Sequence, residues 1–223
     1  MLKKMCVFSL ISLLTFGCSN SSKSNQVIGI YVTPYYNSQP LTINVGEYSR
    51  ELKTSNPKTL SKLADKIHKK IDEVNIETLY VLAIRLYDAG EKDEAAYWFY
   101  TAQFRKNIFG KMQDGEKGGF GSPAFEIPHA LQSFNDLSGT WINGYVAGNP
   151  ENWEQIVRRT MNEGSQMGYI QHAYPSLQFK SEEEQATFVN EFVDFLEGRC
   201  QWILENKDEI LRQRKENGIE GKY

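Results

Sequence analysis

The chain has 223 residues, which is enough for one domain, or two small ones, with a sizeable hydrophobic core. Its 25 lysines and arginines are outnumbered by 28 aspartates and glutamates, so the formal net charge at pH 7 is −3. A mildly acidic protein lacks the basic surface that nucleic-acid binding requires, and we expect no nucleic-acid partner.

Residues 1–17 have the pattern of a secretory signal peptide. Lys3 and Lys4 supply the positively charged start, and residues 6–16 form an apolar run that is too short for an ordinary membrane-spanning helix. Such a segment directs export and is removed from the mature protein, so it takes no part in the fold.

The signal ends in the sequence Leu-Thr-Phe-Gly-Cys at residues 14–18, which resembles the bacterial lipobox. In that motif the cysteine, here Cys18, becomes lipid-modified and forms the new N-terminus, and several acyl chains make the anchoring stable. Phe16 departs from the small residue that is usual at its position, and ordinary signal cleavage nearby is the alternative. Aspartate after the cysteine favours the inner membrane, whereas Ser19 here implies the outer membrane, facing the periplasm.

A polar tether, residues 18–26, follows the anchor. Its serines and asparagines have nothing apolar to bury and are typical of a flexible linker. Of the three cysteines, Cys6 leaves with the signal and Cys18 carries lipid, so Cys200 is left alone. Cys200 lies in line with apolar helical positions, which predicts an inert core residue and no internal disulfide.

The folded domain is expected over residues 27–223. It begins with residues 27–45, which are rich in β-branched and aromatic side chains and are interrupted by Pro34 and by a polar stretch ending at Pro40. This composition predicts two short strands, joined as a β-hairpin at the start of the domain.

The strongest internal pattern lies in residues 77–106. Two apolar stripes at helical spacing are separated by Gly90, which predicts two antiparallel helices with small side chains where they touch. The pair resembles a tetratricopeptide repeat, or a Sel1-type helical pair, at Leu79, Leu82, Ala83, Leu86, Ala95, Phe99 and Ala102. Asn107 stands where the motif usually ends in proline. Because one unit cannot bury its own apolar face, the resemblance implies a compact domain with further helical layers and a protein-binding role.

The remaining pattern is also mostly helical. Asn56 and Pro57 mark the start of a helix that runs to Val74. A glycine-rich loop is then predicted over residues 110–121, followed by helices over 123–145 and 150–164. An irregular segment over 165–180 leads to a long helix over 182–216. The last helix has a predicted apolar side of Phe188, Phe192, Phe195, Leu196 and Ile203, and a capping box at its start formed by Ser181 and Glu184.

The predicted fold class is therefore mostly α, a compact helical domain with one tetratricopeptide-like pair and a short N-terminal β-hairpin. Within the pair, five aromatic residues lie between positions 97 and 104, more than one buried helix face can hold. Tyr97, Tyr100 and Phe104 are the candidate partner-binding residues from this group. The alternative is that they pack between helical layers.

The sequence predicts no catalytic, cofactor or metal site. Glu126 and His129 have the spacing of two metal ligands on one helix face, but Pro128 lies between them, and a zinc site needs three or four ligands. His172 is the one further side chain that could join them in an active site. An enzyme that acts on envelope material would need these three groups in one pocket.

We interpret the protein as a membrane-tethered module that binds another protein, and not as an enzyme. The lipid anchor and the repeat-like helical pair are the two features that favour this interpretation. A sharper alternative is an immunity or inhibitor lipoprotein that neutralises a toxin in the periplasm, since such proteins are small, acidic and lipid-anchored. The other alternative is an envelope-acting hydrolase.

Overall fold

The computed structural model describes residues 48–114, 119–164 and 170–223. The predicted signal peptide, the lipid-carrying Cys18, the tether and the predicted β-hairpin of residues 27–45 lie outside these residues. Most of the described chain is helical, and it contains no strand, which confirms the predicted mostly α fold class. None of the described helices is both long and apolar enough to span a membrane.

Seven α-helices and three short 3₁₀ helices are named in the described residues. In chain order the named elements are η2 (Glu51–Lys53), α1 (Pro57–His68), η3 (Ile71–Glu73), α2 (Ile76–Asp88), α3 (Lys92–Met112), α4 (Pro123–Val146), α5 (Pro150–Gly164), η4 (Ile170–Ala173), α6 (Glu182–Glu205) and α7 (Lys207–Glu216). Two predicted boundaries were wrong. The helix predicted over 57–74 ends at His68 and is followed by η3, and the helix predicted over 182–216 is divided at Asn206.

The helix starts follow local sequence chemistry. The Asn56 side chain accepts a hydrogen bond of 3.1 Å from the backbone N–H of Thr59, and Pro57 occupies the first turn of α1. At the start of α6, Ser181 and Glu184 exchange hydrogen bonds between side chain and backbone, which confirms the predicted capping box. These caps satisfy N–H groups that have no partner inside the helix.

The predicted helical pair is present as α2 and α3, joined by a three-residue turn. Gly90 in that turn has a φ of +88°, a conformation that glycine adopts without steric cost. Ala83 of α2 and Ala95 of α3 are both fully buried. The chain therefore reverses direction where the sequence predicts it, with small residues in the packed interior.

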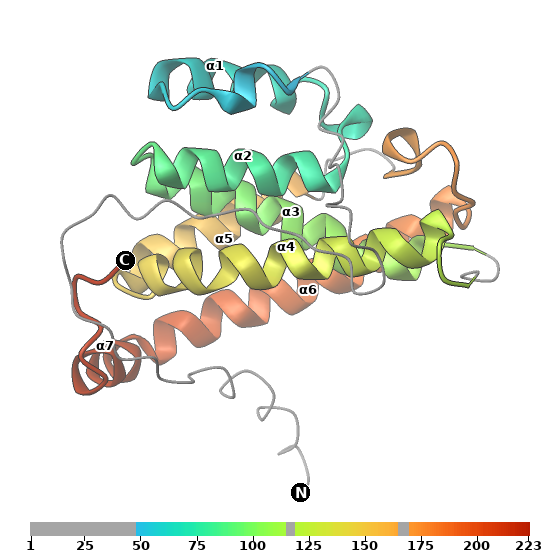
Figure 1. The fold of residues 1–223 in the computed structure, drawn as a ribbon. Helices are drawn as coiled ribbons and strands as arrows, with labels where there is room; N and C mark the ends of the chain where they lie inside the picture. The colour runs from blue at the N-terminus through green and yellow to red at the C-terminus, as the bar shows by residue number, and fades with distance from the viewer. Residues whose placement is uncertain (1–47, 115–118, 165–169) are drawn as a thin grey trace, which may run out of the picture.

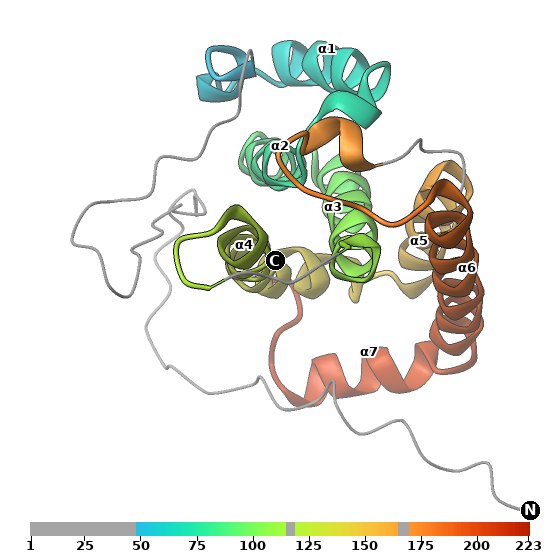
Figure 2. The same ribbon diagram turned by 90° about the vertical axis from the view of Figure 1, so that its right-hand side faces the viewer.

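Helix α3 lies at the centre of the molecule. It packs against α2, α4, α5 and α6, and α1 covers the outer side of α2 (Figure 1). Viewed from the end of the bundle, α4 and α6 lie on opposite sides of α3, and α7 crosses beneath them (Figure 2). Because it is surrounded on several sides, α3 has no single apolar face, and its apolar residues occur all around the helix.

The irregular segment before α6 is tied to the end of α3. The backbone N–H of Lys180 donates to the carbonyl of Met112 at 2.8 Å, and the N–H of Asp114 donates to the carbonyl of Gln178 at 3.0 Å. Ile170 and Tyr174 are buried in the same region. Residues 170–180 thus pack along the α2–α3 helical pair and do not form a free surface loop.

Candidate functional site

The three predicted partner-binding side chains are buried. Tyr97, Tyr100 and Phe104 are 0%, 5% and 2% exposed. The Tyr100 hydroxyl donates to Oδ1 of Asn143 in α4 at 2.7 Å, and the Phe104 ring packs edge-on against Phe192 in α6 at 5.3 Å. The sequence left two interpretations of these residues, partner binding and packing between helical layers. The structure shows packing between layers, because neighbouring helices cover α3 on these sides.

Tyr97 is enclosed by charged side chains of α5. Its hydroxyl donates to the carboxylate of Glu163, and the guanidinium of Arg159 lies 3.6 Å from the centre of its ring. Burial, and then the hydrogen bond to Glu163, raise the pKa of Tyr97 well above its ordinary value. Tyr97 therefore joins α3 to α5 and presents no surface to a partner.

The candidate catalytic groups have separate surroundings. Glu126 accepts a hydrogen bond of 2.9 Å from the backbone N–H of Gly121, and the His129 ring packs against the Phe125 ring at 4.6 Å. His172 is exposed in η4. In the described part of the chain no group of three or more histidine, cysteine, aspartate or glutamate side chains is arranged to hold a metal ion. No contact among the three candidates supports a shared active site.

Cys200 is fully buried in α6, as the sequence predicts. Burial raises the pKa of its thiol to about 11, so the thiolate form needed for nucleophilic attack is disfavoured. Its sulfur lies 3.9 Å from the backbone carbonyl oxygen of Glu154 in α5. The thiol thus packs at the α5–α6 contact.

Arg105 is a buried charge that the sequence does not reveal. It projects from the middle of α3, is 2% exposed, and its Nε and Nη2 atoms donate no hydrogen bond within the described structure. The nearest carboxylate oxygen, Oδ1 of Asp72 in η3, lies 3.9 Å from Nη1. Burial lowers the pKa of Arg105, and the charge of Asp72 opposes that change. The pair is therefore an ion contact without a good hydrogen bond.

A second buried polar contact lies near the start of α2. The Tyr174 hydroxyl donates to Oε2 of Glu77 at 2.6 Å and accepts from the backbone N–H of Ile76 at 2.8 Å. Burial raises the pKa of Glu77 and, together with the neighbouring Glu77 carboxylate, raises that of Tyr174. This contact fastens residues 170–174 to the start of α2, so its role is structural.

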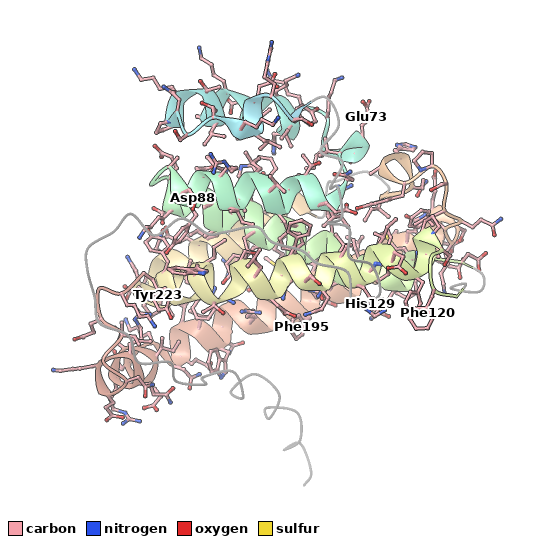
Figure 3. All side chains as sticks on the ribbon, in the orientation of Figure 1. Glu73, Asp88, Phe120, His129, Phe195 and Tyr223 are labelled. Carbon is pink, nitrogen blue, oxygen red and sulfur yellow. The ribbon has the colours of Figure 1, made fainter. Side chains whose placement is uncertain are left out.

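A cavity of about 640 Å³ opens where α4 turns into α5. Its walls come from the start of α3, the end of α4, the first turns of α5, α7 and the C-terminal tail. The residues that matter most for its chemistry are polar or aromatic: Asp93, Tyr145, Asn149, Asn152, Arg214 and Tyr223. In Figure 3, Tyr223 lies at the opposite end of α4 from His129, so the candidate catalytic histidine is far from this cavity along the helix.

Asp93 organises one wall of the cavity. Its Oδ1 accepts hydrogen bonds from the Tyr145 hydroxyl at 2.9 Å and from Nδ2 of Asn152 at 2.7 Å. Burial, and then the hydrogen bond from Tyr145 to Asp93, raise the pKa of Tyr145 to about 12. Lys92 lies beside this wall, with its Nζ 5.3 Å from the centre of the Tyr145 ring.

The C-terminal tail forms the opposite wall. A side-chain carbon added at Gly144 would lie 2.6 Å from the Tyr223 ring, so only glycine permits this close approach. The Tyr223 ring also packs edge-on against Trp141 at 6.1 Å. Arg214 donates to the carbonyl oxygen of Gly144 and holds α7 against the end of α4. The close approach at Gly144 agrees with the packing that a glycine within a helix often indicates.

An aromatic ridge runs along α6 and consists of Phe188, Phe192, Phe195 and Trp202. Phe195 is 60% exposed and Trp202 is 46% exposed, and the rings of Phe192 and Phe195 stack at 5.6 Å. Phe195 projects outward from the helix in Figure 3. The sequence prediction that Phe195 belongs to the core-facing side was wrong, because the residues that α6 buries are Gln185, Leu196, Cys200 and Ile203.

Comparisons with known proteins assign no family. No protein-family model matches the chain, and no solved structure matches it. One relative, an uncharacterized protein of Haemophilus influenzae, is 22% identical over an alignment of 237 positions, which covers 99% of this chain and 89% of that protein. The match spans nearly the whole of both chains, so it compares whole proteins and not one shared motif.

Proposed function

We propose that the protein is a lipid-anchored module that faces the periplasm and holds another protein against the aromatic ridge of α6. The observation that carries the proposal is the exposure of Phe195 and Trp202, at 60% and 46%, on one helix face. These two residues are seven positions apart, so their side chains lie on the same side of the helix. Clustered exposed aromatic side chains are typical of protein interfaces, where they supply much of the binding energy.

The surroundings of the ridge fit the same role. Lys111 forms an ion pair with Glu191 at 3.5 Å, and its Nζ lies 5.7 Å from the centre of the Phe188 ring. Lys180 approaches the same ring at 5.1 Å. An apolar centre with a charged rim is the common anatomy of a protein interface. The likeness of α2–α3 to a tetratricopeptide repeat adds support, because that family binds proteins.

Crosslinking in intact cells tests the ridge. A photoreactive phenylalanine analogue placed at position 195 or 202 of the full chain should crosslink to one protein, because both positions face the partner. The matched control is position 211, where Leu211 of α7 is also exposed but lies off the ridge. The proposal fails if position 211 crosslinks to the same protein equally, or if positions 195 and 202 crosslink to none. If the crosslinked protein is a toxin, the module is an immunity protein.

Truncation of the ridge should weaken partner binding without unfolding the protein. The double substitution Phe195→Ala and Trp202→Ala removes two exposed rings, so the melting temperature should change little. The loss of two interface aromatics should cost at least about 2 kcal/mol of binding, or roughly 30-fold in Kd. Titration of the crosslinked partner against each purified variant measures this, and an unchanged Kd would remove the ridge from the interface.

The lipid anchor has its own prediction. Cys18→Ser should abolish incorporation of labelled fatty acid and release the chain from membranes, because the acyl chains supply its membrane affinity. Cys200→Ser is the matched control and should keep the label, since Cys200 is buried in the core. Labelled fatty acid on the Cys18→Ser variant would disprove the lipobox assignment.

Ser19→Asp should move the protein toward the inner membrane, and unchanged fractionation would refute the outer-membrane assignment.

A further inference from the structure

The cavity at the α4–α5 turn has the volume of a small-molecule site, and its lining is mostly polar. Its volume of about 640 Å³ lies within the range of about 300–1,000 Å³ that is usual for ligand pockets. Three stretches that are distant in the sequence converge on it: Asp93 at the start of α3, residues 145–155, and residues 214–223. The ridge of α6 contributes no residue to its lining, so the two sites are separate.

The charges around the cavity oppose the binding of an ion. Asp93 and Glu151 in its wall disfavour an anion. A cation is disfavoured by Arg214 in the wall, by Lys92 near the Tyr145 ring, and by Lys207, which pairs with Glu151 at 2.9 Å. Arg214 is 9% exposed and already donates to a backbone carbonyl. The cavity therefore suits a polar ligand without net charge.

The remaining lining groups match hydroxyl groups. The side-chain amides of Asn149, Asn152 and Gln155 each offer both a donor and an acceptor, and a ligand hydroxyl also both donates and accepts. The Asp93 carboxylate, already held by two donors, has further lone pairs that can accept from a hydroxyl.

Aromatic rings in the same cavity match the apolar face of a sugar ring. Tyr145 and Tyr223 both line it, and the Tyr223 ring is held in place against Gly144. A tyrosine side chain combines the apolar face of its ring with a polar hydroxyl group. We propose that this cavity binds a neutral saccharide, with the amides and Asp93 contacting its hydroxyl groups and the tyrosine rings contacting its C–H face.

Calorimetric titration of the detergent-solubilised full chain tests this proposal. The probes are the neutral saccharides glucose, N-acetylglucosamine, maltose and chitobiose, with spermidine as the cationic comparison and N-acetylneuraminic acid as the anionic one. We expect saturable binding of at least one neutral saccharide and none of either charged probe. The proposal is overturned if none of the four neutral saccharides binds saturably, or if a charged probe binds more tightly than all of them.

Two variants connect binding to the cavity. Asn152→Ala and Tyr223→Ala should each raise the Kd of the bound saccharide at least tenfold, because one removes an amide and the other a ring from the wall. Asn190→Ala, an exposed asparagine on α6, is the matched control and should leave the Kd unchanged. Melting curves verify that each variant is folded. Equal effects of Asn152→Ala and Asn190→Ala would place binding elsewhere. Partner binding at the ridge should survive Asn152→Ala, so this proposal and the protein-binding function can fail independently.

Discussion

Asp72→Ala should destabilise the protein by about 3 kcal/mol, because it leaves the buried Arg105 guanidinium without its nearest opposite charge. Arg105 is 2% exposed and has two nitrogen atoms without a hydrogen bond in the described residues, so water cannot readily replace the lost carboxylate. The expected cost is at the low end of the range for buried pairs, since the Asp72 side chain is 39% exposed and lies 3.9 Å away. Urea unfolding of the full chain measures the change.

Arg105→Met is the informative comparison for this prediction. Methionine fills similar space without a charge, and replacement of a buried charged group by an apolar one is often neutral or stabilising. Asp72→Ala should then cost much less in the Arg105→Met background than in the parent. The coupling energy from this double-mutant cycle isolates the interaction of the two residues. A coupling energy near zero would show that Asp72 does not compensate the buried charge.

Ala95→Leu should cost about 1–3 kcal/mol, because extra methylene groups would be forced into a filled interior. Ala95 is 0% exposed near the start of α3, which packs closely against α2. The control is Glu91→Ala in the turn between these helices, where the side chain is exposed and the change should be below about 0.5 kcal/mol. If Ala95→Leu and Glu91→Ala unfold at the same denaturant midpoint, the small residue is not required by packing.

The structure alters what is expected at Lys92, the first residue of α3 after this turn. A sequence-based view treats it as an ordinary surface residue whose replacement by alanine costs less than about 0.5 kcal/mol. Its Nζ lies 5.0 Å from the centre of the Tyr87 ring and 5.3 Å from that of Tyr145. A cation over an aromatic ring at an exposed site contributes about 0.5–1 kcal/mol. We therefore expect Lys92→Ala to cost about 0.5–1 kcal/mol of folding stability.

Local sequence patterns predicted where helices begin and reverse. Asn56 and Ser181 cap the helices that follow them, and Gly90 takes the positive φ that a tight turn favours. Each of these features depends on a few neighbouring residues, so it is visible without knowledge of the rest of the chain. The division of α6 from α7 at Asn206 is the exception, because helical periodicity continues through it.

The exposure of aromatic residues was decided by the tertiary structure. Tyr97, Tyr100 and Phe104 are buried because α3 is surrounded by four helices, whereas Phe195 is exposed because α6 packs mainly on one side. Periodicity along a single helix identifies an apolar stripe, but it does not state how many neighbours the helix has. The sequence therefore placed the candidate partner surface on α3, whereas the structure places two exposed aromatic residues, Phe195 and Trp202, on one face of α6.

By itself, the sequence determined the mostly helical fold, the hairpin of α2 and α3 and the buried position of Cys200, because each follows from short-range periodicity and turn chemistry. Only the tertiary structure decided the two candidate sites and the buried Arg105. The cavity joins Asp93 to Tyr145 and Tyr223, and the ion contact joins Arg105 to Asp72. Such contacts are set by helix packing across long stretches of chain, and no local pattern encodes which residues packing will bring together.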